Sequence, residues 1–400
     1  MIKRNLYLKE IRDFYNETSL IKIIYGLRRA GKSIVLTQIM SELVHQNVDK
    51  EHLIYLNFES LKYSFIKGPE DLERYINSFV KDKQIYYVFL DEIQKIEDFE
   101  KAINSLRITN HFSIFITGSN GRVTFRELAT DLSGRYVSFR VHPLTFREIV
   151  AITNTPVTAY QRLLYDVFEW GSLPQRFSFK NKATKLNYLS DVYDSILLKD
   201  VVDRLKIKDV TTLNKILQYL LETEGREFSN KNILAYLKDK YKEISTETLY
   251  NYIEALCSTF IVNRVYRYDI QKKEVLKTLN KFYVADLGVK KVKASGRRIN
   301  EAICLENLVY HELIARGYEV YAGKTKNGKI DFVVMKNTEY KYVQVCCHLS
   351  NPAMIEKEFG AYDAVQDNYP KYVISLDREN FSRDGIQHIN AIQFLKGKGI

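Results

Sequence analysis

Apolar runs and helical patterns alternate regularly over the first 150 residues. Five short runs, rich in β-branched and aromatic residues, have the length of buried strands. These runs are IKIIY (21–25), LIYLNFES (53–60), IYYVFL (85–90), FSIFITGSN (112–120) and YVSFRV (136–141). After the first run, residues 33–44 carry apolar side chains at helical spacing. Strands separated by helices predict an α/β core with a parallel sheet.

Helical patterns dominate the middle of the chain. The predicted helices lie within roughly 157–200 and over 211–225, 228–241 and 244–260. Their candidate N-caps are Thr211 or Thr212, Ser229 and Ser245. Residues 261–270 and 281–288 then alternate as a two-stranded ribbon would. Three short helices and a ribbon predict a winged helix-turn-helix.

The last hundred residues combine both patterns. A helix at 301–317, ended by Gly317, precedes the other elements. These are strands at 318–322, 329–335, 340–346 and 371–376, and a helix near 354–365. The pattern predicts a separate α/β unit.

Composition excludes several classes of protein. The chain has 400 residues, of which 46% are apolar, enough for two or three domains. It has no run of about 18 apolar residues and no secretory leader, so we expect a cytoplasmic protein without a membrane partner. Four cysteines without CxxC spacing predict reduced thiols rather than a disulfide or metal site. They are Cys257, Cys304, Cys346 and Cys347.

The net charge of +11 is concentrated in one region. Residues 201–300 carry 20 Lys and Arg against 12 Asp and Glu, a surplus of eight. The other regions are close to neutral. A regional surplus favours an anionic partner such as DNA, although a lysine-rich surface can also serve solubility alone.

The segment GLRRAGKSIVL (26–36) has the spacing of a P-loop between a strand and a helix. Gly26 and Gly31 allow backbone N–H groups to face phosphate. Lys32 would reach the β and γ phosphates of ATP, and Ser33 would hold Mg²⁺. Arg28, inside the loop, is a further candidate for contact with the nucleotide.

An acidic pair ends the strand at 85–90. Asp91 would position Mg²⁺, as in a Walker-B strand, and Glu92 would orient and deprotonate the attacking water. Such a pair is often only a solvated turn, but a buried strand downstream of a P-loop favours the catalytic interpretation. Along the chain, the strand at 53–60 lies between this strand and the P-loop strand, as in additional-strand P-loop ATPases.

Polar and cationic residues follow the next two strands. Ser119, or with less support Thr117, ends its strand where a side chain can sense the γ-phosphate. Arg135 is the leading candidate for an arginine finger that completes the site. A surface salt bridge is the ordinary role of an arginine here. The rivals for the finger are Arg28, Arg29 and Arg122.

Several motifs together resemble a family of bacterial and archaeal AAA+ superfamily ATPases with a C-terminal domain of unknown function. They are the P-loop, FLDEIQ, ITGSN, LSGRY and HPLTFREIV. WGSLPQ (170–175) is similar to the family's Gly-Gly-x-Pro segment, with Ser172 in place of the second glycine, and implies nucleotide contact by Pro174. The resemblance implies an ATPase core (1–150), a helical lid (151–208), a winged-helix domain (209–298) and a C-terminal domain (299–400).

The winged-helix segment lacks the chemistry of base readout. Its expected recognition helix, residues 245–256, has no Lys or Arg and carries Glu247 and Glu254. Positive charge lies instead in 231–242, in the ribbon and in 290–298. We expect either contact with DNA backbone, without sequence preference, or protein contacts.

The C-terminal pattern resembles the restriction-endonuclease-like fold. That resemblance implies an active site with Glu306 and Asp331, which match, and Glu-x-Lys, where this chain has Gln344 and Cys346. The missing lysine removes a cation that the chemistry needs. Lys329 or Lys341 would be its replacements. We expect a nuclease-like fold without nuclease activity.

Two functions remain open for an ATPase of this composition. The first is a DNA-associated machine that grips the backbone of DNA, branched DNA included, in a homo-oligomer where Arg135 acts in trans. The second is a signalling switch that exposes its C-terminal domains to a protein partner when ATP binds. An active nuclease is a third, weaker hypothesis.

Overall fold

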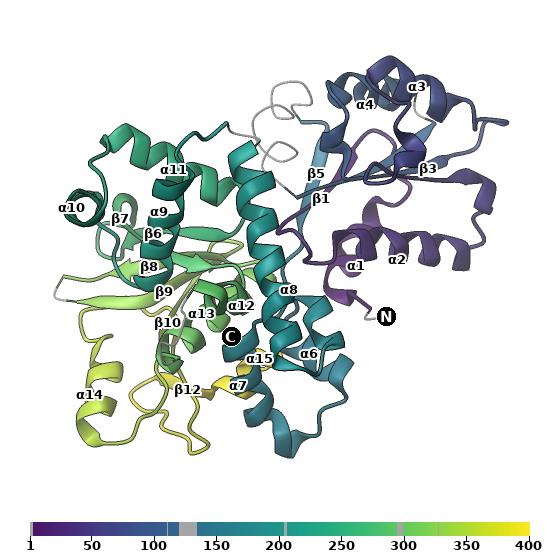
Figure 1. The fold of residues 1–400 in the computed structure, drawn as a ribbon. Helices are drawn as coiled ribbons and strands as arrows, with labels where there is room; N and C mark the ends of the chain where they lie inside the picture. Colours follow the sequence, from purple (N-terminus) through teal and green to yellow (C-terminus); the bar gives the residue numbers. More distant parts are fainter. Residues whose placement is uncertain (1–2, 110, 120–133, 204–205, 294–298, 327) are drawn as a thin grey trace. The chain divides into compact units, whose positions relative to one another are not determined.

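A computed structural model describes residues 3–109, 111–119, 134–203, 206–293, 299–326 and 328–400. The chain divides into two compact units, Met1–Pro143 and Leu144–Ile400 (Figure 1). The predicted mixed α/β class is confirmed, whereas the division into four domains stays a prediction.

The first unit is a five-stranded parallel sheet with helices on both faces (Figure 1). Its strands are β1 (Ile21–Tyr25), β2 (Leu53–Asn57), β3 (Tyr86–Asp91), β4 (Phe112–Gly118) and β5 (Tyr136–Arg140). Its helices are α1 (Asn5–Ile11), α2 (Lys32–His45), α3 (Pro69–Asn77) and α4 (Phe99–Ile108). All five predicted strands are present, so the predicted parallel core is confirmed.

The strand order β2-β3-β4-β1-β5 determines where the chemistry lies. The strand between β1 and β3 in the sheet is β4, whereas β2, which lies between them along the chain, is at the sheet edge. β3 and β4 are buried at every residue, since helices cover both faces. In a parallel sheet the carboxyl ends of neighbouring strands share one edge. The residues after β1, β3 and β4 therefore meet.

The second unit contains most of the helices. They are α6 (Phe146–Thr153), α7 (Tyr160–Trp170), α8 (Lys182–Ser195), α9 (Val210–Glu222), α10 (Asn230–Lys240), α11 (Thr246–Ser258), α12 (Leu287–Lys293), α13 (Glu301–Ala315), α14 (Pro352–Gly360) and α15 (Ala391–Leu395). A π-helix at Ile196–Asp203 directly follows α8. No helix in the described ranges is long and apolar enough to cross a membrane.

Seven strands form the sheet of this unit in the order β12-β11-β10-β9-β8-β6-β7. They are β6 (Val262–Asp269), β7 (Glu274–Val284), β8 (Glu319–Lys324), β9 (Lys329–Lys336), β10 (Glu339–Val345), β11 (Lys371–Ser375) and β12 (Ile386–Asn390). The predicted ribbon exists as the antiparallel pair β6–β7. It is not free, however, because β6 pairs in parallel with β8. The ribbon and the C-terminal strands thus share one sheet.

Two local predictions in the helical region differ from the structure. The cap of α9 is Asp209, whose Oδ1 accepts the N–H of Thr212 at 2.9 Å, and neither predicted threonine is the cap. The carboxylate of Asp209, two residues before Thr211, therefore caps the first turn of α9. Ser245 caps α11 as predicted, whereas Ser229 occupies the cap position of α10 without a side-chain bond. β7 also begins seven residues earlier than predicted.

A buried lysine lies inside the first unit. Lys22, on β1, is fully buried, and its Nζ donates to the carbonyl of Leu20 at 3.0 Å and to Oγ of Ser113 at 2.9 Å. Its ammonium also lies 4.7 Å from the ring centre of Phe115. Burial lowers the pKa of Lys22 to about 7.

This lysine makes the stability of the protein pH-dependent. Below pH 7 the folded core holds a charged ammonium. Between about pH 7 and 10.5 only the unfolded chain keeps the proton, so the free energy of unfolding rises with pH. We expect Lys22→Met to lose this rise, which is about 1.4 kcal/mol per pKa unit at most. Urea unfolding at pH 6 and 9 tests it, with the exposed Lys81→Met as control; parallel curves for wild type and Lys22→Met would contradict it.

Candidate active site

Two glycines shape the loop between β1 and α2. Gly26 has φ 142°, and a Cβ atom there would lie 2.1 Å from the carbonyl oxygen of Val141. Gly31, with φ 105°, is the N-cap of α2. Residues with a Cβ rarely adopt these conformations. The loop leads into a helix terminus whose first N–H groups have no partner within the helix and favour an anion.

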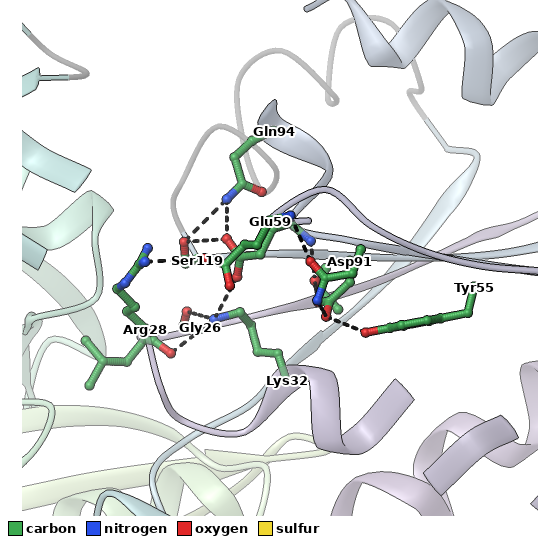
Figure 2. A network of polar contacts seen from close by, with 12 residues as sticks. Gly26, Arg28, Lys32, Tyr55, Glu59, Asp91, Gln94 and Ser119 are labelled. Atoms are coloured by element: carbon green, nitrogen blue, oxygen red, sulfur yellow. Dashed lines mark hydrogen bonds and ion pairs between the residues drawn. The ribbon is translucent and has the colours of Figure 1, made fainter. Parts of the chain in front are cut away.

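Lys32 lies directly beneath this loop. Its side chain is 4% exposed, and its Nζ donates to the carbonyl oxygens of Gly26 and Leu27, each at 3.2 Å (Figure 2). The same Nζ is 3.8 Å from Oε1 of Glu92. Ser33 follows at an exposed position on the first turn of α2. The predicted phosphate-binding residues are thus assembled at one helix terminus.

Asp91 is held rigidly at the end of β3. It is fully buried; its Oδ1 accepts from Oγ1 of Thr117 at 2.5 Å and its Oδ2 from the hydroxyl of Tyr55 at 2.9 Å (Figure 2). Burial and the adjacent carboxylate raise the pKa of Tyr55, so this hydroxyl remains a donor. The orientation of the Asp91 carboxylate is therefore fixed by two neighbouring strands.

Glu92 follows in a left-handed conformation, with φ 56°. Its N–H donates to Oγ1 of Thr117 at 2.9 Å. Its Oε2 accepts from Nε2 of Gln94 at 2.5 Å and from Oγ of Ser119 at 3.1 Å (Figure 2). The other oxygen, Oε1, lies 3.8 Å from the Nζ of Lys32. Thr117 therefore contacts both members of the acidic pair, whereas Ser119 contacts the side chain of Glu92.

The candidate arginines lie at different ends of the sheet. Arg28 lies on the P-loop itself, and its Nη2 is 3.4 Å from Oε1 of Glu59. Arg135 is exposed and precedes β5, where β5 pairs with the amino end of β1. It lies at the opposite sheet edge from the P-loop. Arg140, which the sequence analysis missed, is in register with Tyr25, immediately before the P-loop. Arg29 is exposed, and Arg122 is outside the described residues.

Pro174 belongs to the second unit, where it begins a short 3₁₀ helix. The preceding turn binds Asp286: the N–H of Ser172 donates to Oδ2 at 2.5 Å and its hydroxyl donates to the same oxygen at 3.1 Å. Ser172 thus uses a side chain that glycine lacks. Contact between Pro174 and a nucleotide stays a prediction.

The residues around the P-loop fit a nucleotide with Mg²⁺. Mg²⁺ typically takes one or two protein ligands together with phosphate oxygens and water. Within the described ranges, no group of three His, Cys, Asp or Glu side chains could hold a metal alone. Ser33 and Asp91 would therefore hold the ion together with the phosphates.

Comparison with known proteins agrees with this geometry. Residues 18–150 match a family described as AAA domain, and residues 161–295 match a domain of unknown function (DUF8612). A Haemophilus influenzae protein, called only an uncharacterized protein, is 34% identical over 402 residues, 99% of this chain and 98% of that one. The chain belongs to the same family.

Further relatives extend the family and the fold. An uncharacterized protein of Methanocaldococcus jannaschii is 29% identical, over 94% of this chain and 87% of its own. A Walker-type ATPase of Pyrococcus abyssi has a TM-score of 0.50 at 15% identity, covering 73% of this chain and 96% of its own, and shows the fold alone. The predicted AAA+ core is confirmed at this level: the first unit carries an AAA-type P-loop ATPase domain.

In this family member, a second polar cluster lies in the C-terminal sheet. The Nζ of Lys281, on β7, is 2.9 Å from Oε1 of Glu306 and 3.7 Å from Oδ1 of Asp331. Tyr283 donates to the same Glu306 oxygen at 2.5 Å. The amide oxygen of Gln344 accepts the backbone N–H of Asp331 at 3.1 Å. The three residues implied by the nuclease resemblance therefore gather around a lysine.

The lysine of this cluster is not one that the sequence suggested. Lys329 is exposed, and Lys341 binds the hydroxyl of Tyr318 at 3.2 Å. Lys281 comes from the predicted ribbon and reaches the cluster because β6 and β7 extend the C-terminal sheet. Burial lowers the pKa of Lys281, but Glu306 and Asp331 raise it more, and the net shift is upward. Only the strand order could have identified it.

Gln94 is a further residue that the sequence analysis missed, and we expect it to position Glu92. Gln94→Leu should lower kcat for ATP hydrolysis about 10- to 100-fold with KM little changed, since a loose base loses proton-transfer efficiency. Gln94→Glu should shift the acid limb of the kcat profile to higher pH, because a like charge disfavours ionised Glu92. Steady-state kinetics across pH tests both. A role in folding alone would lower the melting temperature and leave the pH profile unmoved.

Lys281 should stabilise the second unit. Lys281→Met leaves Glu306 buried without its cation, and we expect a loss of about 3–5 kcal/mol. Burial and Asp331 already raise the pKa of Glu306, so the loss should grow as the pH rises and shrink at acid pH, where Glu306 takes a proton more readily than an ordinary glutamate. Urea unfolding measures it, with the exposed Lys329→Met as a matched control. A loss equal at pH 5 and 8 would contradict the argument.

Proposed function

We propose that this chain is a Mg²⁺-dependent ATP hydrolase with Lys32, Asp91 and Glu92 as its central residues. One observation carries the proposal: these three side chains, from α2 and β3, meet at the carboxyl edge of the sheet. Lys32 and the loop N–H groups bind the β and γ phosphates. Ser33 and Asp91 hold Mg²⁺, which neutralises charge on the phosphates when bound.

Glu92 then acts as general base. Its Oε1 accepts a proton from water while the water oxygen forms a bond to the γ-phosphorus. The bond between that phosphorus and the bridging oxygen breaks, and the products are ADP and phosphate. Ser119 senses the γ-phosphate through its bond to Glu92, and Pro174 closes on the nucleotide from the lid. Hydrogen bonds from Gln94 and Ser119 limit Glu92 to one orientation, which supports preorganised catalysis.

Arg135 completes the site of a neighbouring subunit in this proposal. It lies at the sheet edge opposite its own P-loop, and a five-residue strand is about 13 Å long between its first and last residue. Its exposed side chain supports a role in trans within a homo-oligomer. Within one subunit, Arg140, in register with Tyr25, is a further candidate.

We further propose that hydrolysis drives a DNA-associated machine that contacts DNA backbone without reading sequence. The surplus of eight positive charges in 201–300 supports this. Arg264 and Arg267 are poor candidates for contact with DNA phosphate, because both side chains are largely buried. They pair with Glu254 and Glu227, respectively.

The described lysines of the 290–298 segment also have internal partners. Lys290 and Lys291 pair with Glu224 and Glu169, at 2.7 and 3.2 Å, and Lys293 lies over the ring of Tyr193. The exposed lysines available for phosphate include Lys231, Lys272, Lys273 and Lys277. Weak surface pairs such as Lys272–Glu274 do not prevent such contacts.

A signalling switch with a protein partner is the second candidate. The observation that favours it is apolar surface around the ribbon, where Tyr250 is 56% and Val275 is 46% exposed. We expect no phosphodiester cleavage, because the Nζ of Lys281 lies 2.9 Å from Glu306 and 3.7 Å from Asp331, the carboxylates that would otherwise be open to a metal ion.

The test compares ATP hydrolysis by wild type and Glu92→Gln, with and without single-stranded, duplex and four-way-junction DNA. We expect hydrolysis in the wild type that is lost in Glu92→Gln, and stimulation by DNA that falls steeply with salt. About three or four phosphate contacts give a slope of roughly −3 in log affinity against log salt. The pair Lys272→Ala, Lys273→Ala should reduce this slope by about two, whereas the exposed Lys81→Ala should leave it unchanged.

The outcomes test the ATPase assignment and the DNA-associated role separately. No hydrolysis by wild type under any condition would overturn the ATPase assignment. Hydrolysis that none of the three DNA forms stimulates would overturn the DNA-associated machine and leave the protein partner.

A further inference from the structure

We propose that the groove between α10, α11 and the β6–β7 hairpin binds an extended peptide segment of a partner protein. The peptide would carry apolar side chains at alternate positions and acidic residues beside them. This binding site does not depend on ATP hydrolysis. It shares the exposed Lys231 and Lys277 with the DNA contacts proposed above, whereas Lys272 and Lys273 are not among its lining residues. Three features of the groove lead to it: apolar exposure, an open strand edge and a strained leucine.

Large apolar side chains line part of the groove. It encloses about 650 Å³. Four of its large side chains are exposed: Tyr250 on α11 (56%), Tyr266 on β6 (39%), and Val275 and Leu279 on β7 (46% and 39%). Apolar side chains gathered in one groove, rather than scattered singly, mark an interaction site.

β7 is the last strand of its sheet, and its outer edge is only half covered. The N–H groups of Gly225 and Phe228 donate to the carbonyls of Phe282 and Asn280, at 3.1 and 2.8 Å. No backbone hydrogen bond between described residues covers the outer edge of 274–278. Such an edge offers unpaired N–H and C=O groups to an added strand. A bound peptide would extend the coverage that residues 225–228 begin.

Leu279 lies in a strained bulge at this edge. The pairing of β6 with β7 passes from Val265↔Lys281 to Arg267↔Leu276, so that residues 277–280 bulge out of the ladder. Leu279 has φ 55°, a conformation that costs a branched residue free energy. Its side chain is not used in the core, since it is 39% exposed. Glycine would suit the backbone better, which indicates that the leucine side chain serves a contact outside the chain.

Charge around the groove favours an acidic peptide over nucleic acid. Lys231 and Lys277, at its rim, are exposed. Arg264 in its wall already pairs with Glu254 of α11, and α11 carries no Lys or Arg. Tyr250 and Tyr266 are aromatic surfaces of the kind on which bases stack, but Val275 and Leu279 are aliphatic and lie on a strand edge that a peptide backbone can pair with. An apolar peptide with Asp or Glu beside the two lysines satisfies both features.

The test starts from random twelve-residue peptides displayed on phage and selected on the full-length protein. We expect selected sequences with apolar residues at alternate positions and flanking Asp or Glu. A labelled synthetic peptide of that consensus should bind in fluorescence anisotropy, and Leu279→Asp should weaken binding at least tenfold. Binding should also slow amide hydrogen exchange in residues 274–278, which a contact with side chains alone would not do.

Two variants separate binding from folding. Leu279→Gly relieves the backbone strain, so it should keep or raise the melting temperature while binding weakens at least tenfold. Leu186→Asp changes a side chain that is 41% exposed on α8, outside the groove, and should leave binding unchanged.

Three results would overturn the proposal. The first is the absence of an alternating apolar consensus, or binding that is indifferent to Leu279→Asp. The second is oligodeoxythymidine binding that Leu279→Gly abolishes, which would assign the groove to nucleic acid. The third is a change of oligomeric state in Leu279→Asp, which would assign it to a second copy of this chain. None of these results affects the ATPase assignment, which the Glu92→Gln comparison decides.

Discussion

One threonine hydroxyl joins the acidic pair of the nucleotide site to the neighbouring strand. Oγ1 of Thr117 donates to Asp91 and accepts the N–H of Glu92, so the end of β4 fixes both residues at the end of β3. This is possible only because β4 lies between β3 and β1 in the sheet. The same order brings the P-loop to that edge, and Lys32 then lies within 4 Å of Glu92. The geometry of the site thus follows from the strand order.

The second unit depends on a different constraint, the neutralisation of buried charge. Glu306 and Asp331 lie inside a sheet region where unpaired carboxylates would be strongly unfavourable. Lys281 supplies the compensating charge from β7, and Gln344 satisfies the backbone of Asp331. Lys281 thus lies beside two of the residues that the nuclease resemblance implied. The sheet has a polar centre in which charged groups from β7, α13 and β9 are paired with one another.

Local sequence was sufficient wherever function depends on neighbours in the chain. The P-loop spacing identified Gly26, Gly31 and Lys32, and a buried run before two acids identified Asp91 and Glu92. The sequence did not indicate Gln94, because a glutamine two residues after an acidic residue forms no characteristic motif. Lys281 was hidden because its partners are 25 and 50 residues away and meet it only through the pairing of β6 with β8. The candidate finger, Arg135, follows a recognisable motif, but its distance from the P-loop is a property of parallel strand register.

The pairing of β6 with β8 also bears on how such a protein can evolve. Residues 299–400 read as a self-contained module in the sequence, yet their sheet continues into β6 and β7, and their buried acids are neutralised from β7. If gene rearrangement moved this segment without the preceding hairpin, the moved piece would carry uncompensated charge and a bare strand edge. The structural unit in this part of the chain is therefore larger than the unit of sequence pattern.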